Sequence, residues 1–586
     1  MSKKSKLIFK IFGAIVLVIL IVGLSLNFIL GSFVSSAVNS QLKIINTKNH
    51  LDISIETVKV NVFSTTIILK GIDIKPDSTV QSAFDTGNSD KASIYEFKIA
   101  DLRLRGVGLA KILFEKHLAL RRIIVKGISL DIVKGTKKTK STAQVTHKKK
   151  SISIDSLHIG YFNQIDLSKI DIEQYSLNII NAHMGDTATS YKGDKLDLNG
   201  IRLDAYEGIE GVFHFNTEKL NLKLRRQRYD LKGGDYFLYF EKLDFSFSDS
   251  LIKISDFQFK PTRDKFELAS SFKYTKEVFD VDLSSLSIHG LKVGNAIKTG
   301  VVDIDSIVVD ALNIAIFKDK NQPWDYNKRP QFIQQKLKKL KQPIYIDKVI
   351  VKNSKLKYSD RAKGAKDIMV VDITNMNAQL NFVTSIRDSL RSGKDLTINL
   401  KGKLMDSSPL NLDIVMPYTS RVDTFYFSGS LGKAQFKVFN PAIYPAAGIK
   451  FTQGTLNSVF FSCSASPKAS AGTMTMLYSE MEAEVIKKEV EENSKALTWI
   501  ANAVIPTSNP SKKGKTTIAK ISVDRVEYKG LGNLIWKSVQ SGLVNTINPF
   551  GKVVKEDKKA KQDRKSSNKE EKKSSKREKR REKKEK

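Results

Sequence analysis

The strongest constraint on the fold is a strand-like alternation of apolar and polar residues that continues from about residue 49 to residue 486. Residues 66–74, 195–198 and 301–305 are clear examples. A period of two places apolar side chains on one face of a sheet and polar side chains on the other, which faces solvent. Proline, which removes a ladder donor, occurs only 13 times in 586 residues, so long ladders are allowed. The pattern predicts a mainly β, antiparallel-rich fold.

Short helices are expected at three places in this β-rich chain. Residues 330–342 place Phe332, Ile333, Leu337 and Leu340 at spacings of three and four. Residues 494–505 form a second helical pattern within a C-terminal β region, 361–528. Residues 530–547 form an amphipathic third.

The N-terminal residues 11–30 form a largely apolar run behind four lysines, whereas the next lysine is Lys43. A helix of that length spans roughly 30 Å, the hydrocarbon thickness of a bilayer. The lysine asymmetry predicts a cytoplasmic basic end at residues 1–10 and a single transmembrane anchor at residues 11–30. Cleavage of a signal peptide near residues 35–37 is the alternative, although the apolar stretch is longer than the usual signal core.

The charge of +35 is concentrated in part at the C-terminus. Residues 552–586 contain eighteen Lys/Arg and eight Asp/Glu and almost no large apolar residue, which predicts a disordered Lys/Glu-rich tail. Such a chain is attracted to anionic headgroups, although a purely solubilising tail fits the composition equally well. Cys463 is the only cysteine, so no internal disulfide forms.

A weak internal repeat relates residues 102–134 to residues 286–318, with an offset of 184 and six identities in 33 positions. In both copies the apolar alternation changes phase by one residue, at Gly127 and at Ala311, which predicts a bulge or tight turn. The repeat suggests a first β module at 49–160, intervening strands at 161–282 and a second module at 283–360. Chance similarity between two β-rich segments is the alternative.

A long sheet curled around its own apolar face would form a groove suited to acyl chains. The candidate lining residues are the apolar positions of the two repeat copies: Ile123, Val125, Ile128, Leu130, Ile132, Ile307, Val309, Leu312, Ile314 and Ile316. Ordinary core packing is the competing interpretation of the same pattern.

Four features follow one another along the chain: the anchor, then LRLRGVGLAKILFEKHLALRRIIVKGISLDIV, then IYIDKVIVKNSKLKYSD, and then GTLNSVFFSCSASPKASAGTMTMLYSEMEAEVI. In this order the chain is similar to the AsmA-like family of bacterial envelope proteins, of the Bacteroidota type. The resemblance implies an inner-membrane protein with the bulk of the chain in the periplasm. It also implies a repeating β-groove and a role in carrying phospholipid or in outer-membrane assembly. It supplies no catalytic residues.

Residues 530–547 also offer membrane-interface candidates on one side of the predicted helix: Leu531, Leu534, Ile535, Trp536, Val539 and Leu543. Capping of the groove and simple packing against the sheet are alternatives. The seven histidines are scattered, and no nucleotide-binding or hydrolase motif occurs, so no catalytic residue, metal or cofactor is expected.

These features predict a non-enzymatic, membrane-anchored protein that shields and transfers phospholipid or another acyl lipid and so supports outer-membrane homeostasis. The alternative is a scaffold or assembly factor with envelope proteins as partners. Nucleic-acid binding is not expected, because the basic tail lacks aromatic residues for stacking on bases.

Overall fold

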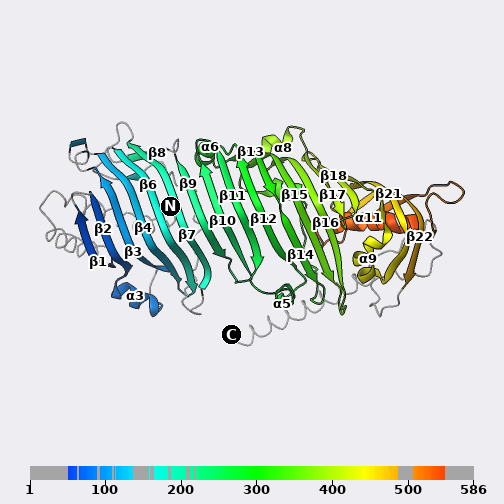
Figure 1. Cartoon of the computed structure of the whole chain (residues 1–586), viewed down its shortest axis with the longest axis horizontal. Coiled ribbons are helices and arrows are strands. Elements are labelled where there is room, and N and C mark those ends of the chain that lie inside the picture. Colours follow the sequence, from blue (N-terminus) through cyan, green and yellow to red (C-terminus); the bar gives the residue numbers. More distant parts are fainter. Residues whose placement is uncertain are drawn as a thin grey trace, which may run out of the picture. The chain divides into compact units, whose positions relative to one another are not determined.

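The computed structural model describes residues 50–61, 65–88, 93–108, 111, 114–115, 117–135, 157–158, 164–181, 187–205, 212–216, 220–485 and 506–547. This part is mainly β, and its strands belong to one large mixed sheet (Figure 1), which confirms the predicted fold class at that level. The predicted anchor at 11–30, the basic end at 1–10, the helix at 494–505 and the tail at 552–586 lie outside the described residues. None of the helices that are described has the length and apolar character needed to cross a bilayer.

The chain divides into two compact units. Unit 1 comprises Met1–Asp264, Phe279–Ile314 and Gln342–Val351. Unit 2 comprises Lys265–Val278, Ala315–Lys341 and Lys352–Lys586. The division runs through three strands, so each unit is described by its own residues.

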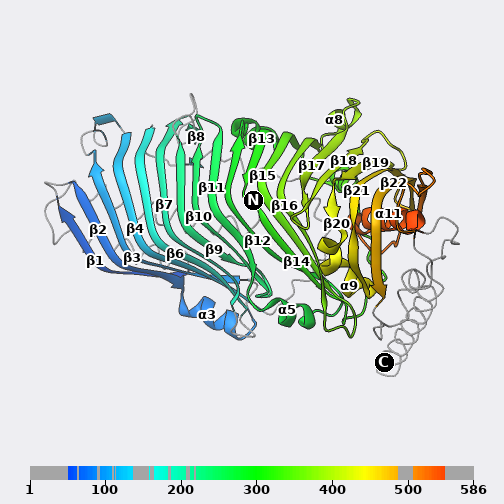
Figure 2. The ribbon, with the colours of Figure 1, turned by 45° about the vertical axis from the view of Figure 1, so that its right-hand side comes forward.

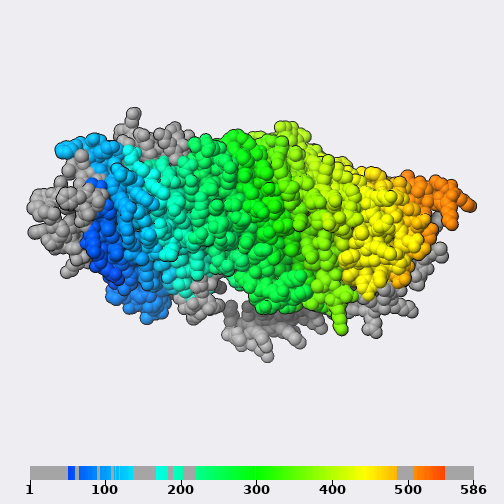
Figure 3. Space-filling model, in the orientation of Figure 1, coloured from blue at the N-terminus to red at the C-terminus, as the bar shows by residue number. Residues whose placement is uncertain are grey.

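The described part of unit 1 consists mainly of strands. In the space-filling view of Figure 3 its residues are coloured from blue to green. Its complete strands are β1 (Leu51–Asn61), β2 (Thr66–Pro76), β3 (Ser93–Val107), β4 (His117–Lys134), β5 (Leu157–His158), β6 (Gln164–Asn181), β7 (Thr187–Ala205), β8 (Val212–Asn216), β9 (Asn221–Asp230), β10 (Tyr236–Ser246), β11 (Leu251–Pro261) and β13 (Val302–Asp310). It also contains most of β12 (Glu277–His289), the start of β14 (Asn313–Asp319) and the first part of β15 (Ile344–Arg361). The helices described in this unit are α3 (Ser78–Asp85) and α6 (Val293–Thr299).

The main ladder of unit 1 pairs β1, β2, β3 and β4 in sequence and continues through β6, β7, β9, β10, β11, β12 and β13. Each of these pairings is antiparallel except β4 with β6, which is parallel. The parallel pair requires a long crossover between the two strands, and residues 135–163 provide it. It also explains why the sheet is mixed, whereas the sequence predicted only antiparallel-rich pairing.

A line of left-handed residues crosses the strands of unit 1 and is here called the crease. It consists of six residues with φ between 45° and 62°: Gly71, Gly127, Gln174, Arg226, Asp256 and Ala311. On each side of the crease the apolar residues alternate, but the phase differs by one residue, as in Ile67 and Leu69 followed by Ile72 and Ile74. The left-handed residue restores the phase, so that all four side chains stay buried. Figure 2 shows these strands bending along their length.

The crease confirms the irregularity predicted at Gly127 and Ala311, which have φ of 62° and 52°. The two repeat copies also share a register, because Leu102 pairs with Val125 and Leu286 pairs with Val309, at the expected offset of 184 residues. Gln174, Arg226 and Asp256 lie outside both copies, however. The irregularity therefore belongs to the whole sheet of unit 1 rather than to two modules.

Unit 2 contains the remaining parts of β12, β14 and β15 and a second set of strands with short helices. These elements are α5 (Lys265–Ser271), α7 (Ile333–Lys339), β16 (Ile368–Thr384), α8 (Arg387–Arg391), β17 (Leu396–Leu404), β18 (Ser408–Met416), β19 (Phe425–Leu431), β20 (Ala434–Gln435), η1 (Phe436–Phe439), α9 (Asn440–Ala447), β21 (Ile449–Ala465), β22 (Ala469–Val485), β23 (Ile518–Asp524) and α11 (Leu531–Ile547). The last strands pair in the order β16, β17, β18, β19, β21, β22 and β23.

The core of unit 2 is a packed aromatic and methionine layer. Phe425 contacts Phe332 and Phe427 at ring-centroid distances of 5.2 and 5.8 Å. Phe425 and Leu396 are fully buried, and Met474 is 1% exposed. Helices also pack on strands of this unit: α9 packs on β16 and β21, and α11 packs on β22 and β23.

The predicted helix at 330–342 forms, but only over Ile333–Lys339. Phe332 is extended, and its N–H donates to Gln335 Oε1 at 2.9 Å, so the helix begins after it. Leu340 has ψ of 124° and ends the helix. The predicted helix at 530–547 is confirmed as α11.

Candidate functional site

The apolar side of unit 1 is built from two aliphatic rows that run across the strands on one side of the crease. Register pairing aligns the first row as Ile172, Leu196, Leu224, Leu243, Ile254 and Leu286, one residue from each of β6, β7, β9, β10, β11 and β12. The second row is Ile170, Leu198, Leu222, Phe245, Ile252 and Ile288 on the same strands. We call these the first and second rows.

A third, more aromatic row lies on the other side of the crease and is here called the aromatic row. It consists of Leu177, Tyr191, Tyr229, Leu238, Phe259 and Val281, again aligned by register. Tyr229 is 37% exposed, which is high for a side chain among apolar neighbours.

The side chains of the first and second rows are neither buried nor fully exposed. By contrast, the corresponding positions in β2 and β3, such as Leu69, Leu102 and Leu104, are at most 2% exposed. The helices of unit 1 that pack closely on its strands are α3 against β2 and α6 against β13. The described residues therefore provide no helix layer over the rows between β6 and β12.

The two predicted sets of lining residues fall in common rows. The first row continues to Val125 on β4 and to Val309 on β13. The second row continues to Ile123 and Ile307 on the same two strands. Residues separated by 184 positions thus lie at opposite ends of shared rows, with six strands between them.

The other predicted lining residues have varied positions. Leu130 extends the aromatic row, since it pairs with Leu177. Ile128 pairs with Tyr175 and Ile132 pairs with Ile179. Leu312 and Ile314 follow the crease at Ala311 and are partly buried, as is Ile316, which belongs to unit 2.

Sequence reasoning missed a polar cluster on the apolar side of unit 1. Tyr175 and Tyr191 both donate their hydroxyls to Gln227 Oε1 at 2.5 Å. Gln227, which is 1% exposed, donates in turn to the carbonyl of Arg225 at 2.6 Å. Gly193 lies between Tyr175 and Gln227, and a Cβ there would approach Tyr175 Cζ to 2.3 Å. The phase change at Gln174, which turns Tyr175 to the apolar side, is the sequence signal for this cluster.

Burial controls the ionisation of this cluster. It raises the pKa of Tyr175 well above the usual range for a phenol, and the neighbouring Tyr191 hydroxyl raises it further. Burial also raises the pKa of Tyr191. Both hydroxyls therefore stay protonated and act as neutral hydrogen-bonding groups.

The opposite side of the same strands is charged and internally paired. Asp171 is buried and bonded to Arg122 and to Lys169, whose Nζ lies 2.9 Å from Asp171 Oδ1. Asp197, directly opposite Asp171 in the β6–β7 register, lies 3.3 Å from Lys195 Nζ. Burial and the hydrogen bond with Asp171 raise the pKa of Asp197. Apolar and charged residues thus occupy opposite sides of one sheet, as in an antiparallel sheet with one wet face.

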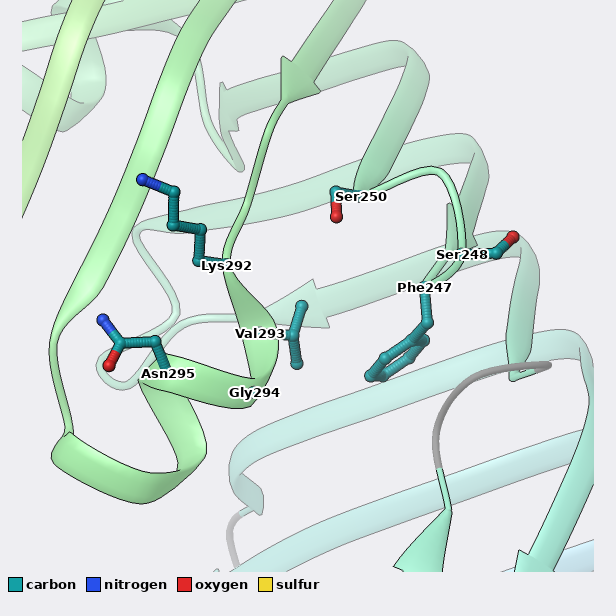
Figure 4. Close-up of a pocket in the computed structure, with 7 residues that line it drawn as sticks. All are labelled: Phe247, Ser248, Ser250, Lys292, Val293, Gly294 and Asn295. Atoms are coloured by element: carbon teal, nitrogen blue, oxygen red, sulfur yellow. The ribbon is translucent and has the colours of Figure 1, made fainter.

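A small pocket of about 370 Å³ lies at the strand ends of unit 1, near the second row (Figure 4). Its lining residues are Phe247, Ser248, Ser250, Lys292, Val293, Gly294 and Asn295. Phe247 stacks on Phe245 of the second row, with ring centroids 4.2 Å apart. Lys292 Nζ donates to Asp303 Oδ2 at 2.8 Å, so its ammonium group is held by a carboxylate at the pocket. The lining is mixed, with polar side chains from Ser248, Ser250, Lys292 and Asn295.

The predicted membrane-interface residues lie on α11 in unit 2 with differing exposure. Leu534 is buried, whereas Leu531, Ile535, Val539 and Leu543 are partly buried. Trp536 is 45% exposed. Packing against the sheet is therefore part of the role of this helix.

Within the described residues, no group of three or more His, Cys, Asp or Glu side chains is arranged to hold a metal ion. No known protein-family model matches the sequence. Comparison with curated proteins likewise gives no match. The resemblance to the AsmA-like family stays a prediction.

Proposed function

We propose that this protein is an inner-membrane-anchored periplasmic protein that shields and transfers phospholipid or another acyl lipid along the apolar side of unit 1. The observation that carries the proposal is the partial exposure of the first and second rows between β6 and β12. Contiguous exposed apolar surface is uncommon in soluble proteins and marks a binding surface when it occurs.

The chemistry of the rows suits a hydrocarbon ligand. Eleven of their twelve side chains are Ile or Leu, and the remaining one is Phe245, so the rows offer no hydrogen bond and no charge. Transfer of each methylene group from water to such a surface contributes about 0.8 kcal/mol. Such binding needs no covalent step and would discriminate ligands mainly by apolar area.

Continuity of the rows supports movement of the ligand as well as binding. The first row is partly exposed from Ile172 on β6 to Leu286 on β12 without a polar interruption, and it ends at the buried Val125 on β4 and Val309 on β13. Neighbouring strands are about 4.8 Å apart, so a ligand would move between nearly equivalent sites. The charged opposite side would remain in water.

Lipid co-purification with mass spectrometry tests the proposal. The paired substitution Leu130→Asp with Ile314→Asp should strongly reduce the bound acyl lipid, because an unpaired carboxylate on this surface opposes hydrocarbon binding. The matched control is Ser129→Asp with Ala315→Asp, which adds the same charges at the neighbouring positions, where alternation points the side chains to the opposite face. The control should retain lipid.

Two results would count against the proposal. One is a wild-type protein that carries no acyl lipid, and the other is equal lipid content in the paired variant and its control. Crosslinks to envelope proteins, together with envelope permeability that is unaffected by Leu130→Asp and Ile314→Asp, would favour a scaffold or assembly factor instead.

A further inference from the structure

Helix α11 packs on unit 2 through an unusual stripe of mostly small residues. The buried positions are Leu534, Ser538, Gly542 and Thr546, which recur every four residues. Ser538 donates to the Ser470 hydroxyl of β22 at 2.9 Å, and a Cβ on Gly542 would lie 2.8 Å from Met474. The helix is therefore held close to the sheet by its smallest side chains.

The larger apolar residues of α11 consequently lie beside the buried stripe. Ile535, Val539 and Leu543 each follow a buried residue by one position, which places them about 100° around the helix. All three are partly exposed, and the adjacent Trp536 is 45% exposed. We call these four residues the outer flank of α11; the helix itself is labelled in Figures 1 and 2.

Cationic residues gather near the C-terminal end of this helix. Asn545 Nδ2 donates to the carbonyl of Lys520 at 2.8 Å, so this end of α11 lies against β23. Lys520 is exposed, as is Ile518, at 66%. The turn that precedes β23 exposes Lys512, Lys513 and Lys515. The sequence after α11, residues 552–586, has eighteen Lys/Arg against eight Asp/Glu.

We propose that the outer flank of α11 docks on an anionic lipid surface, with the neighbouring lysines Lys512, Lys513, Lys515 and Lys520 supplying the electrostatic attraction. Partly exposed apolar residues beside cations are the signature of a helix that lies in a membrane interface. Each Lys or Arg near an anionic leaflet contributes about 1 kcal/mol, and that contribution decreases with salt. Charge complementarity therefore favours a lipid bilayer over an apolar protein partner.

The inference extends the proposed function, on which it rests, by giving the lipid-handling chain a second membrane contact in unit 2. Its test does not require lipid transfer. The chain has three tryptophans, so Trp324→Phe with Trp499→Phe leaves Trp536 as the sole reporter. The full-length chain is reconstituted in unlabelled vesicles and mixed with a second population of vesicles that contain brominated lipid.

Trp536 should be quenched by brominated vesicles containing phosphatidylglycerol and much less by vesicles of phosphatidylcholine alone. Given several cations, we expect the apparent affinity to differ by about tenfold or more at low salt and the difference to shrink at high salt. Val539→Glu with Leu543→Glu should abolish quenching. The control is Asn533→Glu with Ser541→Glu, which adds the same charge at positions that each precede a buried residue by one and so lie on the other side of the stripe. The control should leave most of the quenching.

Equal quenching by both lipid compositions, no quenching by either, or equal loss in the two double variants would overturn the inference. Lipid content measured on the same preparations separates the two proposals. Bound acyl lipid without docking would refute only the second membrane contact, whereas docking without bound lipid would refute the proposed function.

Discussion

Unit 1 and unit 2 both contain sheets with one apolar face, but the described residues place helices on several strands of unit 2 and none on the strands β6 to β12 of unit 1. In unit 2, Leu396 on β17 is fully buried, and α9 and α11 pack over the strands. In unit 1, Leu243 on β10 is also a leucine on the apolar face, but it remains partly exposed. Identical side chains therefore serve as a core in one unit and as an open surface in the other.

The alternating pattern therefore specifies a sheet with one apolar face, but it does not specify what covers that face. In unit 2 the cover depends on short elements with their own requirements, such as the small-residue stripe of α11. In unit 1 the crease keeps apolar residues on one side over the full strand length, which enlarges the surface without covering it.

Replacement of a leucine by alanine should reduce stability more on the apolar face of unit 2 than on that of unit 1. Leu396→Ala in unit 2 removes a fully buried side chain and should cost about 3–5 kcal/mol of stability. Leu243→Ala in unit 1 removes a partly exposed one and should cost about 1–2 kcal/mol. Urea unfolding followed by hydrogen exchange in β17 and β10 measures each unit separately. Equal costs would mean that the two faces are equally buried.

Removal of the helical cover should destabilise unit 2 locally. Gly542→Leu forces a side chain into space occupied by Met474 and should cost about 2–3 kcal/mol and increase exchange in α11 and β22. Gly532→Leu is the control, since a Cβ there meets nothing within 4 Å. An equal effect of both substitutions would contradict close packing of α11 through its small residues.

Substitutions at two equivalent positions of the crease should have different effects on stability. Gly127→Ala places a Cβ on a residue with φ of 62° and 2.9 Å from Ala100 Cβ, which should cost about 1–2 kcal/mol. Residue 311 has φ of 52°, a conformation that glycine adopts more easily than alanine. Ala311→Gly should therefore stabilise the surrounding strands or leave their stability unchanged. Thermal unfolding monitored in β4 and β13 measures both. Destabilisation by Ala311→Gly as large as that by Gly127→Ala would contradict the conformational argument.

The smallest effect concerns acid sensitivity in unit 2, where Glu277 and Lys318 form a partly buried ion pair. Glu277 lies 2.5 Å from Lys318 Nζ. Burial raises the pKa of Glu277, but the ammonium group of Lys318 outweighs it and holds the pKa below its usual range. The stabilisation is therefore complete above the ordinary glutamate pKa of about 4.3 and is lost as pH falls through the lower folded pKa.

Glu277→Gln should accordingly remove part of the acid-induced loss of stability below that pH. Thermal unfolding of unit 2 measured as a function of pH, in wild type and in the variant, tests the sign. If the stability of the wild type rose as the pH fell through this range, the pKa of Glu277 would not be lowered in the folded protein.

Much of the fold follows from local sequence signals. The alternation predicted the strands, and the phase change at Gly127 and Ala311 predicted the crease at those two positions. Gln174 and Arg226 escaped notice, because their side-chain types do not favour a left-handed conformation, which the neighbouring strands impose. Asp256 was missed as well, although aspartate adopts this conformation more often than most residues. The parallel β4–β6 pair also depends on tertiary pairing across a long crossover.

The candidate site was partly predictable for the same reason. Ile123, Val125, Ile307 and Val309 were correctly placed on one apolar side, since strand periodicity determines the side. The Tyr175–Gln227–Tyr191 cluster was missed, because it requires the lateral alignment of three strands around Gly193. The small-residue stripe of α11 was missed too, because hydrophobic periodicity favours Ile535 and Val539 as the buried face.

The central claim is that the apolar side of unit 1 binds acyl chains, whereas the apolar face of unit 2 is a closed core. A photoreactive amino acid at position 243, with a matched probe at position 396, tests it directly in the full-length protein purified from its host cell. The account predicts acyl-lipid adducts at position 243 and none at position 396. Absence of lipid adducts at position 243, or equal adducts at both positions, would contradict it.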